Sequence, residues 1–256
     1  MSIFGRFRNG PLEARPHMIG IIGAMEVETE ALRSLLRNAT VETNGGTVYC
    51  RGELEGREVV IATCGIGKVH AGICTQHMID RYHPDCILNS GVGGCLSPDL
   101  HIGDIAIATA AVQHDMDTSP LGDPVGMISG IGLVNLPCDP ELVRAAQTAA
   151  EEEGFHTVSG VIATGDQFVS GQNMKSRITG RFGAIACDME GGAIAQVCYL
   201  HGIPCLILRS ISDEADGRAP ENFPKFVHSA TERSVALIRR LLRRFPDSIL
   251  RGDHHA

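Results

Sequence analysis

The chain has 256 residues, of which 43% are hydrophobic, so it can bury a sizeable core and is neither a disordered tail nor a disulfide-stapled miniprotein. Its 30 Asp and Glu residues outnumber its 22 Lys and Arg residues, and the formal net charge of -8 disfavours nucleic acid or an anionic membrane as a partner. With no Trp and only 4% aromatic residues, the composition fits an enzyme that acts on a small molecule best.

Short apolar runs alternate with periodic helical stretches from Met18 onward. The runs are too short for buried helices and are mostly rich in β-branched residues, which predicts strands at Ile19–Ile22, Val59–Thr63, Cys86–Leu88, Ile105–Ala108, Val158–Ala163 and Cys205–Leu208. Apolar residues at helical spacing predict helices at Val27–Leu36, Val69–Arg81, Glu141–Glu153, Met189–His201 and Phe226–Arg240. This alternation predicts an α/β fold with three layers, in which helices flank a central, twisted sheet that is mostly parallel or mixed.

The organisation of the chain is that of one domain, because no internal repeat, low-complexity tract or linker divides it. We expect this domain over residues 18–245, with a flexible tail at 246–256. Residues 1–17 carry three arginines and no continuous apolar stretch, which predicts a flexible extension and not a signal peptide. No apolar run approaches the roughly 18–20 residues that a membrane helix needs. The long irregular stretch Gln113–Pro140 is typical of lids and subunit contacts.

The sequence contains only incomplete versions of the motifs that bind metals, nucleotide phosphates or dinucleotide cofactors. The nine cysteines are an odd number without a C-x-x-C pair, so we interpret them as buried hydrophobes in a reducing cytoplasm. The turns Gly65-Ile-Gly-Lys68 and Gly91-Val-Gly-Gly94 lack the spacing of a P-loop or a dinucleotide fingerprint. His114-Asp-Met-Asp117 has no further ligand cluster beside it. We therefore predict neither a metal nor an organic cofactor.

Glu28 is an acidic residue on the apolar face of its predicted helix. It precedes Ala31, Leu32 and Leu35 by three, four and seven residues, which places its carboxylate on the inward, apolar face of the first turn. The helix N-terminus would stabilise this charge. The ordinary alternative is that acids are favoured in any first turn, whatever their role.

Glu190 and Asp213 extend this pattern. Glu190 also shares the apolar face at a helix start, and the glycines after it, Gly191 and Gly192, leave the backbone open to a ligand. Asp213 follows a buried run at the carboxyl end of a predicted strand, where open α/β sheets place their ligands. A helix N-cap is the ordinary alternative for Asp213. Together, the three acids suggest a pocket for acid–base work such as glycosidic cleavage, in which one carboxyl protonates the leaving group and another orients water.

Six blocks of sequence then resemble one family. They are Ile19-Gly-Ile-Ile-Gly-Ala-Met-Glu-Val-Glu28, Gly65-Ile-Gly-Lys68, Asn89-Ser-Gly-Val-Gly-Gly94, Thr164-Gly-Asp-Gln-Phe-Val169, Asp188-Met-Glu190 and Arg209-Ser-Ile-Ser-Asp213. In this order, from about Met18 to about Leu242, they resemble the 5′-methylthioadenosine/S-adenosylhomocysteine nucleosidases of the nucleoside phosphorylase superfamily. The resemblance implies a nucleoside phosphorylase-like fold.

The resemblance also implies roles for individual residues. Asp213 would protonate adenine N7, with Ser212 steering it, while Glu28 and Arg209 would position the attacking water. The remaining substrate contacts implied are Glu190 and Met189 at the ribose, Phe168 and Val169 at adenine, and Ala24, Met25, Ile66, Val92 and Phe223 along the base, ribose and thioalkyl pockets. In the family a segment of a neighbouring subunit closes the 5′ pocket, which implies a homodimer with Thr118 and Leu121 in that lid.

Departures from the family pattern bear on the substrate. Val92 stands where Ser or Thr is usual, and Asp188 stands where Glu is usual. Thr118 and Leu121 replace larger apolar and aromatic groups, which leaves the preferred 5′ substituent open. Phosphorylases of the superfamily gather arginines around phosphate, whereas this chain has Glu26, Glu28 and Asn89 at the matching places, which favours water as the nucleophile.

We expect a cytoplasmic hydrolase that cleaves the N-glycosidic bond of 5′-methylthioadenosine and S-adenosylhomocysteine, and by extension of 5′-deoxyadenosine. The alternatives are a hydrolase of aminodeoxyfutalosine, a purine nucleoside phosphorylase, and a nucleoside-binding protein without turnover. The expected partner is a small adenine nucleoside, with no nucleic acid and no membrane.

Overall fold

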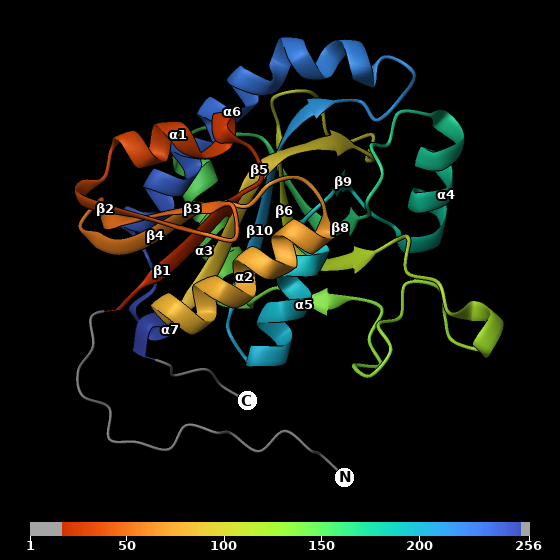
Figure 1. The fold of residues 1–256 in the computed structure, drawn as a ribbon. Coiled ribbons are helices and arrows are strands. Elements are labelled where there is room, and N and C mark those ends of the chain that lie inside the picture. The colour runs from red at the N-terminus through yellow and green to blue at the C-terminus, as the bar shows by residue number, and fades with distance from the viewer. Residues whose placement is uncertain (1–16, 252–256) are drawn as a thin grey trace.

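A computed structural model describes residues 17–251 of the chain, so nearly all of the predicted N-terminal extension lies outside the described residues (Figure 1). Its strands are β1 (Ile19–Gly23), β2 (Arg37–Asn44), β3 (Thr47–Leu54), β4 (Arg57–Thr63), β5 (Cys86–Cys95), β6 (Ile105–Gln113), β7 (Leu136–Pro137), β8 (Thr157–Thr164), β9 (Ala186–Asp188) and β10 (Cys205–Asp213). Its helices are α1 (Glu26–Ser34), α2 (Lys68–Tyr82), α3 (Pro140–Glu152), α4 (Gln172–Phe182), α5 (Gly191–His201), α6 (Ala219–Arg243) and α7 (Asp247–Arg251), with a 3₁₀ turn at Ser119–Leu121.

The sheet is mixed, as the alternation predicts, and part of it closes on itself. β1 lies between β4 and β5 and is parallel to both, and its five residues are all buried. β5 also pairs with β10 and β9, and the order β5, β10, β6, β8, β9 returns to β5, which makes a closed ring of five strands. Closure leaves these strands without an open edge. The ring is mixed, because β6 is antiparallel to β10 and β9 is antiparallel to β5.

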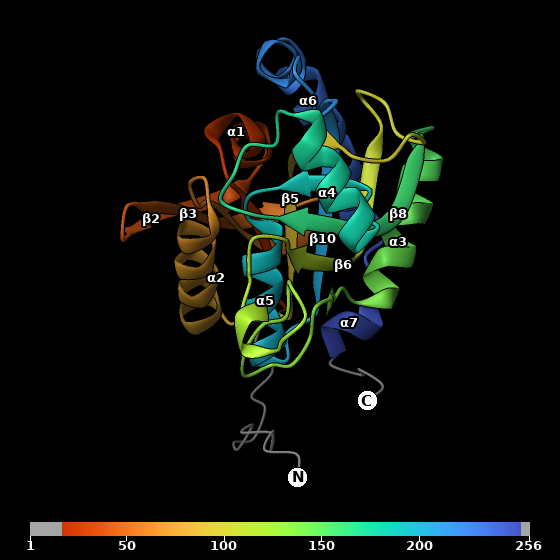
Figure 2. The ribbon, with the colours of Figure 1, turned by 90° about the vertical axis from the view of Figure 1, so that its right-hand side faces the viewer.

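The helices form two layers around this sheet, which confirms the three-layer α/β fold. α6 packs with α1 and with α3 on one face, and α2 packs with α5 on the other (Figures 1 and 2). One hydrophobic cluster spans the sheet and both helix layers. Close approach depends on Gly20, because a Cβ there would lie 2.6 Å from Met78 Sδ.

The antiparallel elements were not predicted from the sequence. β2 and β3 form a hairpin whose turn, Gly45 and Gly46, has positive φ angles of 55° and 81°. α6 begins at Ala219, seven residues before the predicted start, with Pro220 in its first turn, where proline is tolerated, and it continues through Pro224, which has no N–H to donate to the carbonyl four residues earlier. α7 buries Ile249 and Leu250 against the core, so packed structure continues past the expected boundary at residue 245.

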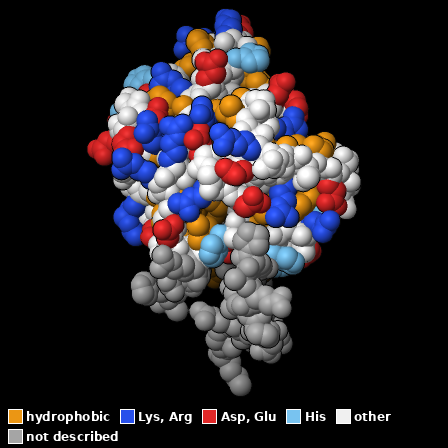
Figure 3. Space-filling view, turned by 90° about the vertical axis from the view of Figure 1, so that its left-hand side faces the viewer, with side chains coloured by type: hydrophobic (Ala, Val, Ile, Leu, Met, Phe, Trp, Pro, Cys, Tyr) orange, Lys and Arg blue, Asp and Glu red, His pale blue; other side chains and the backbone are white. Residues whose placement is uncertain are grey.

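The cysteines are buried, as predicted from the sequence, and the surface carries charges of both signs. All nine cysteines, which lie within the described part of the chain, are free and buried. The face in Figure 3 intersperses Lys and Arg with Asp and Glu. Among the ion pairs of the described residues, Glu55 pairs with Arg239 and Arg243 of α6 at 2.6 and 2.8 Å. Within residues 17–251, no helix has the length and hydrophobicity needed to cross a membrane.

Candidate active site

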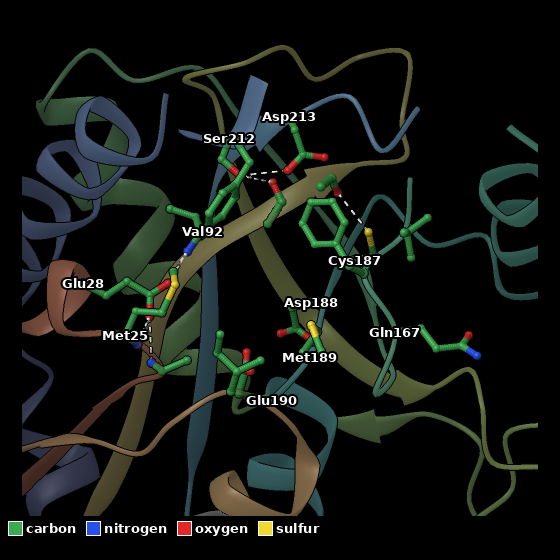
Figure 4. A pocket seen from close by; sticks show the side chains of 17 residues that line it. Met25, Glu28, Val92, Gln167, Cys187, Asp188, Met189, Glu190, Ser212 and Asp213 are labelled. Carbon is green, nitrogen blue, oxygen red and sulfur yellow. Dashed lines mark hydrogen bonds between the residues drawn. The ribbon is translucent and has the colours of Figure 1, made fainter. Parts of the chain in front are cut away.

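A cavity of about 210 Å³ opens at the carboxyl ends of β1, β5 and β10 (Figure 4). It is lined by Ala24, Met25, Glu28, Ile66, Val92, Gly93, Gly94, Gln167, Phe168, Val169, Cys187, Asp188, Met189, Glu190, Ser212, Asp213 and Phe223. The three acids singled out from the sequence therefore meet in one space, which Glu28, Glu190 and Asp213 enter from different sides in Figure 4. No Lys or Arg side chain is among the lining residues.

Glu28 is held by three backbone amides. It is the third residue of α1, and its Oε2 accepts hydrogen bonds from the amides of Ala24 (2.7 Å) and Met25 (2.9 Å), which a helix start leaves unpaired. Its Oε1 accepts a third from the amide of Val92 (3.0 Å) in β5. The approach requires Gly91, because a Cβ there would lie 2.6 Å from Oε1. Burial raises the pKa of Glu28, while these amides and the charge of Arg209 oppose the rise.

Asp213 is the last residue of β10 and is 2% exposed. Ser212 Oγ donates to its Oδ2 (3.0 Å), and the Ala215 amide donates to its Oδ1 (2.9 Å). This arrangement is a local turn and not the helix N-cap considered from the sequence, since α6 starts later with Arg218 at its N-cap. Burial raises the pKa of Asp213 and is only partly opposed by the two donors, which favours a carboxyl that carries a proton to a ligand.

Glu190 stands at the N-cap position of α5 and is 7% exposed. Its Oε1 accepts a hydrogen bond from the Gly67 amide (2.8 Å), in the turn that leads into α2. Burial and the nearby charge of Asp188 raise the pKa of Glu190 to about 7, against the opposing charge of Arg209. The carboxylate therefore ionises near neutral pH, where a change of ligand or pH can shift it.

Arg209, which the resemblance places beside the attacking water, is not among the residues that line the cavity. Its guanidinium is 1% exposed and is occupied by Asp188 Oδ2 (2.6 Å), Asn89 Oδ1 (2.5 Å) and the Leu208 carbonyl (2.8 Å). Its Nε is buried without a hydrogen-bond partner among the described residues. Arg209 acts on Glu28 only through space, where its charge favours the ionised carboxylate.

The apolar side of the cavity contains the ring of Phe168. This ring is 47% exposed and meets Phe223 edge to face, with centroids 6.0 Å apart. Val169 beside it is buried. A planar heterocycle could stack on Phe168 and hydrogen-bond to the neighbouring backbone.

The predicted lid residues lie outside this cavity. Thr118 precedes the 3₁₀ turn, and Leu121 ends that turn with 83% of its surface exposed. All the other predicted site residues except Arg209 line the cavity.

Five lining residues were not among the predicted site residues: Gly93, Gly94, Gln167, Cys187 and Asp188. Four of them lie within blocks that carried the resemblance, and Cys187 directly precedes one, so their position in the sequence could have identified all five. Gly94 lies so close to the site that a Cβ there would stand 3.1 Å from Asp213 Oδ1.

Fold and site together define a nucleoside-cleaving α/β protein, and the chain belongs to the phosphorylase superfamily, whose family model matches residues 18–243. Within it, the chain belongs to the 5′-methylthioadenosine/S-adenosylhomocysteine nucleosidases. The nucleosidase of Aeromonas salmonicida is 38% identical over 226 residues, which cover 88% of this chain and 98% of that protein.

Solved structures show the same family. The nucleosidase of Neisseria meningitidis in complex with methylthio-immucillin-A is 33% identical, with a TM-score of 0.87 over 89% of this chain and 99% of that one. A futalosine hydrolase of Helicobacter pylori is 35% identical, with a TM-score of 0.86 over 90% of this chain and 98% of that one.

Proposed function

We propose that this protein hydrolyses the N-glycosidic bond of 5′-methylthioadenosine and S-adenosylhomocysteine, releasing adenine and the 5-substituted ribose. The observation that carries the proposal is the convergence of Glu28, Glu190 and Asp213, each buried, on one cavity. Relatives named as nucleosidases for these two substrates support the assignment.

Asp213 acts as the general acid in this proposal. Its raised pKa favours the protonated carboxyl, which donates to adenine N7 so that the base leaves as a neutral molecule. Ser212 holds one carboxyl oxygen and the Ala215 amide holds the other, which fixes the direction of the proton. As the bond to the sugar breaks, positive charge develops on the ribosyl group, and the nearby carboxylates stabilise it.

Glu28 and Glu190 have different roles, which follow from how many acceptor positions on each carboxylate are left free by the protein. A carboxylate has about four acceptor positions. The protein occupies three on Glu28, so about one remains for a water molecule beside the sugar. On Glu190 the Gly67 amide occupies one position on Oε1, and Oε2 remains for the ribose hydroxyls.

Adenine release in phosphate-free buffer tests the reaction. Because no Lys or Arg lines the cavity, we expect ultraviolet detection to show adenine formed from methylthioadenosine at the same rate with and without phosphate. A rate that requires phosphate would identify a phosphorylase. Binding of the nucleoside without adenine release would identify a non-catalytic binding protein.

Aminodeoxyfutalosine is the second candidate substrate, since a futalosine hydrolase is among the similar structures. Its adenine and ribose are the same, so only the 5′ side separates the two activities. We expect kcat/KM for methylthioadenosine and S-adenosylhomocysteine to exceed kcat/KM for aminodeoxyfutalosine. The opposite order would assign the site to the futalosine reaction.

A change of pH should separate ribose binding from adenine binding. The carboxylate of Glu190 accepts from the ribose hydroxyls only when ionised, and its raised pKa of about 7 means that this form is lost as the pH falls through 7. Between about pH 8 and about pH 6, we expect the Kd of a 7-deaza analogue of methylthioadenosine, which N7 protonation cannot cleave, to rise about tenfold. The Kd of adenine should stay nearly constant, and Glu190→Gln should remove the difference. A parallel response of both ligands would contradict the role of Glu190.

The protein is further proposed to be a homodimer in which Thr118 and Leu121 of one protomer close the 5′ pocket of the other. Support comes from exposed apolar side chains at helical spacing: Ile66, which lines the cavity, and Val69 and Ile73 on α2 are 53%, 72% and 56% exposed. We expect sedimentation to give twice the chain mass of 27.3 kDa, and Val69→Asp to give the single-chain mass with reduced activity. A monomeric, fully active wild-type protein would exclude the shared pocket.

A cytoplasmic location is proposed on the nine free cysteines, which fit a reducing compartment. Fractionation of the source cells tests it, and recovery of the protein outside the cytoplasmic fraction would exclude it.

A further inference from the structure

Two segments that contribute lining residues to the cavity, at Ile66 and at Gln167–Val169, are tied to a third segment, after β6, by a ring of polar contacts. Lys68 Nζ pairs with Asp115 Oδ1 at 2.7 Å, and Asp115 Oδ2 accepts a hydrogen bond from the Asp166 amide at 3.0 Å. Asp166 Oδ1 closes the ring by accepting from the Lys68 amide at 2.8 Å. We call Lys68, Asp115 and Asp166 the clasp. It joins the first residue of α2, the segment after β6 and the segment after β8.

The clasp lies one residue from a contact that the proposed reaction needs. Gly67, directly before Lys68, donates from its amide to Glu190 Oε1 at 2.8 Å. Gly67 has a φ of 100°, in the region that favours glycine, and a Cβ there would lie 3.0 Å from Asp166 Oδ1. The Asp166 carboxylate therefore packs directly against the turn whose amide orients Glu190.

The charges of the clasp are partly shielded from water, which strengthens their attraction. The side chains of Lys68 and Asp115 are each 20% exposed. Partial burial raises the pKa of Asp115, but the contacts with Lys68 and with the Asp166 amide outweigh this, so the net direction is downward. Lys68 Nζ also donates a hydrogen bond to Oε1 of Gln113 at 3.3 Å, so the last residue of β6 also holds the clasp in place.

We propose that Asp115 is a positioning residue for the ribose site, which it serves by holding the Gly67 amide on Glu190 through Lys68 and Asp166. The inference rests on the proposed function for the identity of the ligand. Glu190 would bind the ribose hydroxyls before the bond breaks as well as while it breaks, so loosening the clasp weakens ground-state binding and changes KM more than kcat.

Asp115→Asn tests the proposal, since it keeps the size of the side chain and removes the charge that pairs with Lys68. Displacement of a remote support can cost up to about 10²-fold, and for this partly buried cluster we expect KM for methylthioadenosine to rise about tenfold. The kcat should stay within about twofold. The Kd of the 7-deaza analogue should rise as KM does, whereas the Kd of adenine, which has no ribose, should stay within about twofold.

Lys68→Gln provides the second variant, because it breaks the same ion pair from the other side. We expect the same split between ribose-containing and ribose-free ligands, and a double variant no weaker than either single one. Glu58→Gln is the matched control. It breaks the exposed pair of Glu58 with Arg51 (3.4 Å), which lies on β4 and β3 away from the cavity, and it should leave both ligands unaffected.

The outcomes separate this inference from the function on which it rests. An unchanged KM, an equal loss of affinity for adenine and the analogue, or a fall in kcat alone would overturn the positioning role. If the wild-type protein released no adenine while Asp115→Asn weakened only the analogue, the proposed function would fail and the role of the clasp would stand.

Discussion

Asp213→Asn should lower kcat by about 10²–10⁴-fold, the range typical of a lost general acid. The amide keeps the shape of the side chain, its oxygen can accept from the Ala215 amide, and its NH2 group can donate to the Ser212 hydroxyl oxygen, so the local turn should survive. It has no acidic proton to give to N7. Adenine would then have to leave as an anion, and the barrier to bond breaking would rise by about 3–5 kcal/mol. A kcat measured with methylthioadenosine, together with a Kd for the analogue, gives the comparison.

The control for this variant is Asp216→Asn. Asp216 follows Asp213 by three residues, caps the Arg218 amide at 2.8 Å and does not line the cavity. We expect its kcat to stay within about twofold of the wild type and the analogue to bind both variants well. If Asp213→Asn retained full turnover, another group would have to be the proton donor.

The inward acids were predicted because helical spacing is a local property. Glu28 could be placed on the apolar face from residues within two turns, and the structure buries it there. The amide of Val92, 64 residues away, could not be foreseen, because it depends on β5 lying beside β1. The helical spacing therefore predicts that Glu28 is buried. The number of its acceptor positions that remain for a ligand depends on the pairing of β5 with β1, which the spacing does not predict.

The alternation of strands and helices in the sequence could not predict that part of the sheet closes into a ring. That pattern predicts parallel neighbours, such as β1 and β5, but β6 runs antiparallel to β10 and completes the ring. The hairpin of β2 and β3 was different, because Asn44 followed by two glycines is a turn signal that was available in the sequence.

For Arg209, the resemblance predicts the position in the chain but not the direction of the side chain. The motif brings the arginine to the right strand, but the direction of its side chain is decided by Asp188 and Asn89, which hold two sides of the guanidinium. Asp188 in turn is fixed by the Thr164 hydroxyl and by the Gly191 amide at 3.1 Å. The pair of Arg209 and Asp188 is therefore part of the support behind the cavity wall, with charges that tune Glu28 and Glu190.

Arg209→Met should destabilise the protein by about 3–5 kcal/mol, the cost of leaving a buried partner charge uncompensated. The side chains of Arg209 and Asp188 are 2% and 1% exposed, so water cannot replace the guanidinium. Urea unfolding at neutral pH measures the loss as a lower midpoint with an unchanged slope. Arg239→Met is the matched control. It breaks a pair with Glu55 at an exposed site that Arg243 also serves, and it should cost no more than about 1 kcal/mol.

The double variant Arg209→Met with Asp188→Asn separates charge from packing. If the unpaired carboxylate causes the loss, the neutral amide should recover much of it, because its oxygen can accept from the Gly191 amide while its NH2 group donates to the Thr164 hydroxyl oxygen. If the loss came only from the shape of the missing guanidinium, the second substitution would recover nothing. Equal stabilities of Arg209→Met and Arg239→Met would show that the buried pair carries no special weight in this fold.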